Sequence, residues 1–304
     1  FKEPKIVHKE NNLITFINLE IEIQENDIVY CQLDHLEVLF RLIKKLDFSN
    51  IKIISTQSDR KINKSLFERK PSCISRWYSI NVDYNHPQLI SIPLGIASYR
   101  NTKSVIFSDF SNPIINNDIN QSFYTNFNIN TNYFHRIKAQ KSIINFLGQN
   151  VMENIDYSSY LTNLRSSVYC IAPWGNGYDT HRFWESLYSG SIPITRKHLI
   201  YDSFSTLPKI LVEDYEVINY EFLIDKLQDL RKDIDNYNLK ELDFNYWKKI
   251  IKDKNSDLND KNSQILINHN YRLYRNIADF KHVLKSKLKI FDRPRRLIYK
   301  MFKI

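Results

Sequence analysis

Residues 172–193, with the sequence APWGNGYDTHRFWESLYSGSIP, combine residue types from which a phosphate-binding site can be built. The whole chain has only five glycines, yet Gly175, Gly177 and Gly190 all fall in or beside this short stretch. Its pattern predicts a strand end, a glycine loop and a helix that stops at Gly190. Ligands of open α/β sheets bind at the carboxyl ends of strands, and a helix N-terminus favours an anion. An ordinary turn would also account for the two loop glycines.

The expected helix carries both signs of charge near its start. Asp179 or Thr180 is placed to be the N-cap, and His181 and Arg182 follow in the first turn, where the helix dipole disfavours a cation. Glu185 lies three residues after Arg182 and therefore on the same edge of the helix. This spacing suits a cation for a diphosphate and a carboxylate for ribose hydroxyls. A weak surface salt bridge between Arg182 and Glu185 is the alternative.

Two α/β series must position these residues. In the first, the pattern predicts a helix at 35–46 and strands at 27–33, 51–56, 73–82 and 89–92. The second follows the irregular residues 100–120, with strands expected at 122–127, 167–172, 192–195 and 209–212, and helices at 133–147, 157–165, 180–189, 220–234 and 246–251. We therefore predict an N-terminal lobe over 1–105, a C-terminal lobe over 106–278 and a tail over 279–304.

The net charge of +9 is concentrated in the tail. Residues 281–304 hold nine Lys or Arg and one acidic residue, a net charge of +8, interleaved with bulky apolar side chains. Such a segment can lie on an anionic membrane surface, and a terminal helix docked on the protein is the alternative. No nucleic-acid-binding motif accompanies the charge, so we expect no nucleic-acid partner.

The cysteines and the hydropathy of the chain bear on its compartment. Cys31, Cys73 and Cys170 are far apart and odd in number, which is typical of reduced, buried thiols in a reducing compartment. No apolar run approaches the roughly 20 residues of a membrane-spanning helix, and no signal-peptide pattern occurs. We expect a cytoplasmic protein, peripheral on the inner face of the membrane.

A longer stretch around the glycine loop resembles a known family. The sequence YLTNLRSSVYCIAPWGNGYDTHRFWESLYSGSIPI, with FYTNFNINTNYFHR before it and LPKILVEDY after it, is similar to the C-terminal signature of exostosin-like glycosyltransferases. The resemblance covers roughly residues 120–215, and NVDYNHPQLISIPLGI is similar to the segment before the linker in bacterial relatives. Other families of the same fold, including some fucosyltransferases, have a comparable Glu-bearing helix before a Gly-x-Pro strand.

The resemblance implies a GT-B fold, in which two Rossmann-like lobes face a cleft and the C-terminal lobe binds a nucleotide sugar. It implies transfer of a sugar from a nucleoside diphosphate donor, UDP-type by expectation, to a glycan or lipid-linked glycan acceptor in surface polysaccharide or glycoconjugate synthesis. Neither a cofactor nor a metal is expected. A second Glu seven or eight residues after Glu185 is missing, with Pro193 at that distance, which favours an inverting mechanism.

Carried over residue by residue, the resemblance implies a donor site. Arg182 would contact the phosphates and Glu185 the ribose, with Arg136 as a second phosphate contact. The remaining donor-binding candidates come from the loop and the start of the helix: Gly175, Asn176, Gly177, Asp179 and His181.

An inverting transfer needs a base for the acceptor hydroxyl. Asp34, at the end of a predicted buried strand, is the first candidate, although a plain helix N-cap would explain it equally well. Asp83 and His86 are further candidates, with turn residues as the alternative. Two non-enzymatic functions also stay open: a non-catalytic nucleotide- or glycan-binding protein, and a membrane-attached scaffold of a glycan assembly complex.

Overall fold

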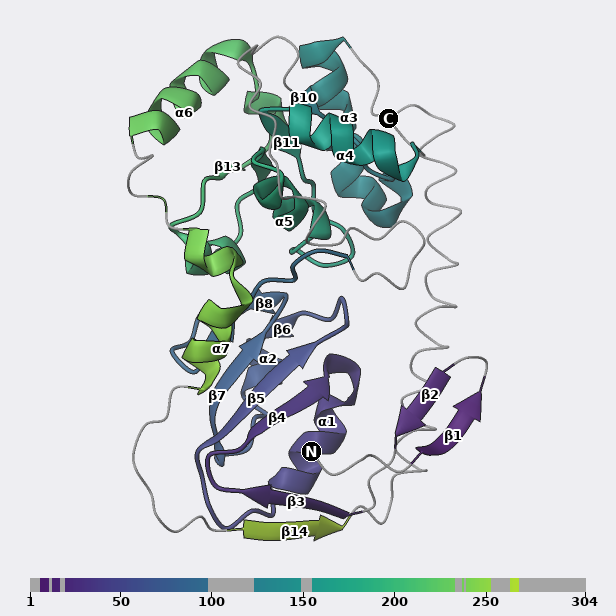
Figure 1. Cartoon of the computed structure of the whole chain (residues 1–304), viewed down its shortest axis with the longest axis vertical. Coiled ribbons are helices and arrows are strands. Elements are labelled where there is room, and N and C mark those ends of the chain that lie inside the picture. Colours follow the sequence, from purple (N-terminus) through teal and green to yellow (C-terminus); the bar gives the residue numbers. More distant parts are fainter. Residues whose placement is uncertain are drawn as a thin grey trace. The chain divides into compact units, whose positions relative to one another are not determined.

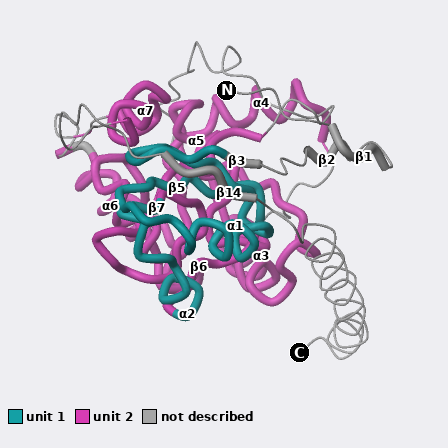
Figure 2. The backbone as a smooth tube through the Cα atoms, turned by 90° about the horizontal axis from the view of Figure 1, so that it is seen from below, with its two compact units in different colours: residues 1–58, 65–77, 254–304 teal, residues 59–64, 78–253 magenta. Residues whose placement is uncertain are grey.

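The computed structural model describes residues 6–10, 13–16, 20–97, 123–148, 155–232, 237, 239–252 and 263–267. The chain divides into two compact units (Figure 2). Unit 1 comprises Phe1–Ser58, Ser65–Trp77 and Lys254–Ile304, and unit 2 comprises Asp59–Lys64 and Tyr78–Asp253. The boundary expected after residue 105 and the whole basic tail over 279–304 lie outside the described residues.

The fold is α/β with parallel sheets, as the sequence predicts. One four-stranded sheet has the order β4 (Ile28–Gln32), β5 (Ile51–Thr56), β7 (Ile74–Ser79) and β9 (Leu89–Ser91). β4 and β5 run parallel and lie side by side in Figure 1. β5 alternates buried and half-buried residues because its side chains point to opposite faces of the sheet.

Unit 1 has a helix and an indole in its core. A short 3-10 turn, η1 (Leu33–His35), leads into α1 (Leu36–Ile43), which buries Leu36, Leu39, Phe40 and Ile43 at helical spacing. Trp77 is fully buried, lies edge-on to Phe40 and donates its indole N–H to Ser55 Oγ at 2.7 Å. The buried indole N–H is therefore satisfied.

The sequence patterns did not predict several short elements. β1 (Ile6–Glu10) and β2 (Leu13–Phe16) form an antiparallel pair, and β3 (Glu20–Gln24) pairs antiparallel with β14 (Ser263–Ile267). The polar segment after β5 contains β6 (Ile62–Asn63) and α2 (Lys64–Phe67). β6 pairs in parallel with β8 (Val82–Asp83), a pairing between segments about twenty residues apart that no local period reveals.

Unit 2 contains a second sheet, whose four strands are all parallel and stand in chain order. These are β10 (Phe123–Tyr124), β11 (Tyr169–Ile171), β12 (Ile192–Arg196) and β13 (Ile210–Val212). The connecting helices are α3 (Tyr133–Leu147), α4 (Tyr157–Ser166) and α5 (His181–Tyr188), and α6 (Tyr220–Lys232) follows the last strand. The bounds predicted for α3 are confirmed at both ends.

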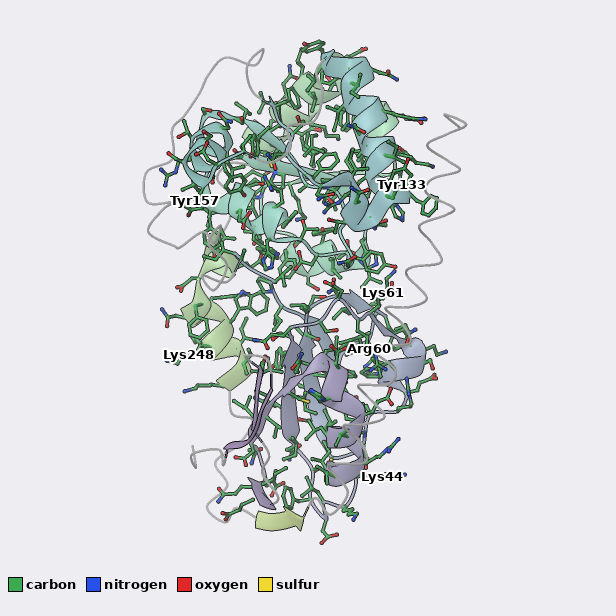
Figure 3. The ribbon with its side chains drawn as sticks, turned by 90° about the vertical axis from the view of Figure 1, so that its right-hand side faces the viewer. Lys44, Arg60, Lys61, Tyr133, Tyr157 and Lys248 are labelled. Atoms are coloured by element: carbon green, nitrogen blue, oxygen red, sulfur yellow. The ribbon has the colours of Figure 1, made fainter. Side chains whose placement is uncertain are left out.

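Helices cover both faces of this second sheet. Tyr169 and Ile171 of β11 pack into a core with Ile143 of α3 and Leu223 of α6. Cys170, between them, faces the opposite side and packs with residues of α4. In Figure 3 the first residues of α3 and α4, Tyr133 and Tyr157, accordingly lie on opposite sides of unit 2. A parallel sheet covered by helices on both faces is compatible with the Rossmann-like lobe expected from the sequence.

Caps define the ends of these helices. Asp156 accepts a hydrogen bond from Ser159 N at 3.0 Å and begins α4. α3 ends at Gly148, whose φ of 65° lets its N–H bond Ile144 O at 2.8 Å, and Gly190 follows α5 with a φ of 82°. The helix stop predicted at Gly190 is therefore present, because a left-handed residue is most easily a glycine.

The remaining described elements of unit 2 are short. They are η4 (Ile129–Asn132), η5 (Leu199–Phe204), η6 (Tyr215–Val217), η8 (Leu239–Leu242) and α7 (Phe244–Lys252). Within the described ranges, no helix is both long enough and apolar enough to cross a bilayer. The same ranges contain no group of three or more His, Cys, Asp or Glu side chains placed to hold a metal ion.

Candidate anion-binding site

The candidate site lies at the carboxyl edge of the sheet of unit 2. Because β11 and β12 are parallel, the segments that follow them, residues 172–180 and 197–198, leave the sheet at the same edge. The glycine loop therefore stands where open α/β sheets bind ligands. Two further segments of unit 2, around Lys61 and Asn81, contribute side chains there.

The two loop glycines make room for protein side chains. A Cβ at residue 177 would lie 2.7 Å from Cγ of Asn81, which is buried and has a φ of 53°. A Cβ at residue 175 would lie 3.3 Å from Nη2 of Arg136. Neither glycine has a positive φ, so close packing and not backbone conformation requires a glycine at these positions.

Arg136 of α3 holds the glycine loop in place. Its Nε donates to Trp174 O at 2.9 Å, its Nη2 to Pro173 O at 3.3 Å and its Nη1 to Asn128 O at 2.8 Å. Burial and the charge of Arg182 lower the pKa of Arg136 to about 10. Most of the guanidinium donors thus form hydrogen bonds to main-chain carbonyls, which do not neutralise its charge.

Asp179 anchors the other end of the loop. Its carboxylate is 5% exposed and accepts hydrogen bonds from Thr180 N (2.9 Å), Trp184 Nε1 (2.8 Å) and Leu94 N (2.9 Å). Burial raises the pKa of Asp179 to about 7, although the three donors oppose that rise. Asp179 is therefore a buried structural carboxylate and not the N-cap of α5.

The N-cap of α5 is Thr180, one of the two residues expected there. Its side chain makes no capping hydrogen bond, and its Oγ1 is buried with no hydrogen-bond partner among the described residues. His181, the first helical residue, bonds Gly95 O through Nδ1 at 2.7 Å. A carbonyl oxygen only accepts, so Nδ1 carries the proton in this arrangement.

Arg182 and Glu185 are enclosed and do not form the surface salt bridge considered from the sequence. Glu185 is 5% exposed; one carboxylate oxygen accepts from Tyr160 Oη and the other from Ala97 N at 3.4 Å. The guanidinium of Arg182 lies over the rings of Tyr160 (4.5 Å) and Tyr124 (5.4 Å), and its buried Nη1 has no hydrogen-bond partner in the described part of the chain. Burial lowers the pKa of Arg182, but these neighbours outweigh it, so the group stays charged.

Five residues that are not among the predicted site residues gather at the glycine loop, to which two of them, Trp174 and Tyr178, belong. Tyr178 stacks on His198 with ring centres 3.7 Å apart, and Lys61 lies over the Tyr178 ring and donates to its Oη. Trp174 meets Tyr178 edge-on at 4.9 Å, and the guanidinium of Arg196 lies 5.1 Å from the Trp174 ring. Lys61 can be located by its label in Figure 3. The site therefore combines cations with aromatic rings.

Hydrogen bonds fix the protons on two histidines of this cluster. Ile200 N donates to His198 Nδ1 at 3.3 Å, so the neutral ring carries its proton on Nε2 and donates to Asp83 at 3.1 Å. Burial lowers the pKa of His198 more than Asp83 raises it. His135 accepts from Arg196 through Nδ1 at 3.2 Å, and burial together with nearby cations lowers its pKa. Both rings are therefore held in their neutral forms near neutral pH.

Four cations around the loop have no carboxylate partner among the described residues. Lys61, Arg136, Arg182 and Arg196 form no ion pair within 4.0 Å, whereas the neighbouring Lys197 pairs with Glu213 at 3.3 Å. Arg136, Arg182 and Arg196 are half-buried, whereas Lys61 is exposed. A half-buried cation without a counterion is costly. A bound anion would offset that cost.

The other predicted site residues have separate environments. Asn176 is the exposed residue between the two loop glycines. Asp34 is exposed in η1 of unit 1 and accepts from Ser58 Oγ at 2.9 Å, so it does not act as a side-chain N-cap of α1. Asp83 accepts from His198 and, at 3.4 Å, from Tyr178 Oη. His86 accepts from Gln88 N at 3.1 Å, as the turn interpretation anticipates.

Comparison with known proteins identifies no family for this chain. No protein-family model matches the sequence, and no curated protein matches it significantly. The resemblance to exostosin-like glycosyltransferases therefore stays a prediction based on the residues themselves.

Proposed function

We propose that unit 2 binds the diphosphate of a nucleotide sugar and that the protein is a glycosyltransferase of the GT-B type. The observation that carries this proposal is the group of four cations at the carboxyl edge of a parallel sheet, none of which has a carboxylate partner in the described part of the chain. A diphosphate supplies negative charge to pair with these cations, and its oxygens suit the forked donors of arginine.

The composition of the site favours a nucleotide sugar over a simple phosphate. The aromatic ring of Trp174 stands among the cations, and rings of this kind contact nucleobases and sugars. Trp174 Nε1 is buried and has no hydrogen-bond partner among the described residues, which leaves one oriented donor for a ligand oxygen. Lys61 and Arg196 join Arg182 as proposed phosphate contacts, whereas Arg136 acts mainly by shaping the loop.

The proposed reaction moves the sugar to a hydroxyl of a glycan or lipid-linked glycan acceptor with inversion at the anomeric carbon. The cations stabilise the diphosphate as it leaves, which is the role a metal ion plays in other transferases. We propose a metal-independent reaction with a UDP-type donor. The basic tail over 279–304 is proposed to bring the enzyme to an anionic membrane surface, where a lipid-linked acceptor would be found.

A nucleotide-sugar panel tests the proposal. The full chain is screened by thermal shift with UDP, GDP, CMP and their sugars in a phosphate-free buffer, and hits are followed by release of nucleoside diphosphate with and without EDTA. A ligand at 100 times its dissociation constant stabilises a protein by about 2.7 kcal/mol. Stabilisation by UDP and turnover that survives EDTA are expected. Binding without turnover would point to the non-catalytic binding protein, and no binding of any nucleotide would refute the site.

A further inference from the structure

We infer that His181 is the base that deprotonates the acceptor hydroxyl, an inference that rests on the proposed glycosyl transfer. The starting observation is the bond from His181 Nδ1 to Gly95 O at 2.7 Å. Since the carbonyl can only accept, the proton of the neutral ring stays on Nδ1, and Nε2 keeps its lone pair. Nε2 has no hydrogen-bond partner among the described residues, and His181 is half-buried.

The other described histidines of unit 2 have the opposite arrangement. His86, His135 and His198 each accept a hydrogen bond at Nδ1, from Gln88 N, Arg196 Nη1 and Ile200 N respectively. Their neutral rings therefore carry the proton on Nε2 and cannot accept another there. Of the described imidazoles in this unit, His181 alone presents a lone pair at Nε2.

The carboxylates of the site are committed elsewhere. Asp179 and Glu185 are each 5% exposed, and both of their oxygens accept from protein donors. Asp83 accepts from His198 and Tyr178. A base must reach the proton that it removes, and these groups are either enclosed or already shared.

The position of His181 fits the reaction. It is the first residue of α5 and directly precedes Arg182, so it stands at the carboxyl edge where the donor is proposed to bind. Nε2 takes the proton of the acceptor hydroxyl while the hydroxyl oxygen forms its bond to the anomeric carbon. The bond from that carbon to the phosphate oxygen breaks, and its electron pair leaves with the nucleoside diphosphate. The imidazolium keeps its Nδ1–H bond to Gly95 O and then loses the new proton to solvent.

Replacement of His181 by Asn gives a matched test. The Asn amide nitrogen takes the place of Nδ1 and can still donate to Gly95 O, but nothing replaces the lone pair of Nε2. With the donor and acceptor that the wild type uses, we expect kcat of His181→Asn to fall by about 100- to 10,000-fold. The dissociation constant for UDP, measured by calorimetry, should stay within about threefold of the wild-type value, because no donor contact is lost.

A second variant separates catalysis from folding. His181→Ala loses both nitrogens, and added imidazole should restore part of its kcat if the missing group is a base. An unchanged kcat in His181→Asn would overturn the inference while leaving the proposed function intact. A loss of UDP affinity that matches the loss of kcat/KM would overturn it too, because His181 would then be a donor contact. A wild type that binds UDP but transfers no sugar would refute the transferase function itself, and the base with it.

Discussion

The carboxyl ends of β4 and β5 in unit 1 present different side chains from those of β11 and β12 in unit 2. At the first edge, Asp34 and Ser58 form an exposed hydrogen bond, and Tyr30 bonds Thr56 in the same way. The second edge carries Arg196 and a loop whose residues are mostly buried. Two pairs of parallel strands thus end in edges that differ in their chemistry.

The difference shows where binding chemistry originates. The strand β12 and the helix α5 supply Arg196 and Arg182, but other contacts of the second edge come from residues distant in sequence, since Lys61 reaches Tyr178 across 117 residues and His198 reaches Asp83 across 115.

The largest effect is expected from Gly177→Ala, because the loop of unit 2 is closely packed. The new Cβ would meet the carboxamide of Asn81, and overpacking of this kind costs about 1–3 kcal/mol, with the upper end expected here. Urea unfolding measures the loss. In the double variant with Asn81→Gly the loss should be smaller than the sum of the two single changes. Strict additivity would show that the two positions do not touch.

Asp179→Asn should have the next largest effect. The amide places a donor against Leu94 N, so we expect a loss of about 1–3 kcal/mol in the free energy of unfolding. The pKa of Asp179 is raised to about 7 in the folded protein, so its contribution to stability is complete below about pH 4 and is lost as the pH rises through 7. The gap between wild type and variant should therefore be widest near pH 4. A gap that widens toward pH 8 would contradict the raised pKa.

Arg196→Met and Lys61→Met should each weaken UDP binding about tenfold, or about 1.4 kcal/mol, because each removes one cation from the proposed diphosphate site. Calorimetry at low salt measures this, and the difference should shrink at high salt, where charges are screened. Lys44→Met, in the exposed C-terminal cap of α1, removes the same charge from unit 1 and serves as the matched control. An equal loss of UDP affinity in Lys44→Met would show that the effect comes from net charge and not from the proposed site.

The smallest effect is expected at the edge of unit 1. Ser58→Ala removes an exposed hydrogen bond to Asp34, and exposed changes of this kind stay within about 0.5 kcal/mol of wild-type stability. UDP affinity should not change. Thermal unfolding and calorimetry on the same sample are sufficient, and a loss of UDP affinity would contradict the contrast between the edges.

The sequence predicted the parts of the fold that depend on local periodicity. The bounds of α3 and β5 and the helix stop at Gly190 were correct, because amphipathic spacing and a left-handed glycine are local signals. The short strands β6 and β8 were missed, since each has two residues and depends on its distant partner.

The site was predictable only in outline. The loop, Arg182 and Glu185 could be found from spacing, but their enclosure by Tyr124 and Tyr160 depends on two other elements of unit 2. The glycines were correctly singled out, although the reason lies in Asn81 and Arg136, which are distant in sequence. His135 and His198 had no sequence pattern, because hydrogen bonds in the folded protein, and not spacing, decide which nitrogen carries the proton.

The contact of residue 177 with Asn81 also constrains the order in which this protein can change during evolution. A side chain at 177 costs about 1–3 kcal/mol while the carboxamide at 81 is present, so a substitution at 81 lowers the cost of a later change at 177. Glycine is the residue best suited to that first step, because the φ of 53° at position 81 disfavours residues with a Cβ. Divergent copies of this loop should therefore favour an intermediate with glycine at both positions, and drift at 177 should be more frequent in lineages that have already lost Asn81.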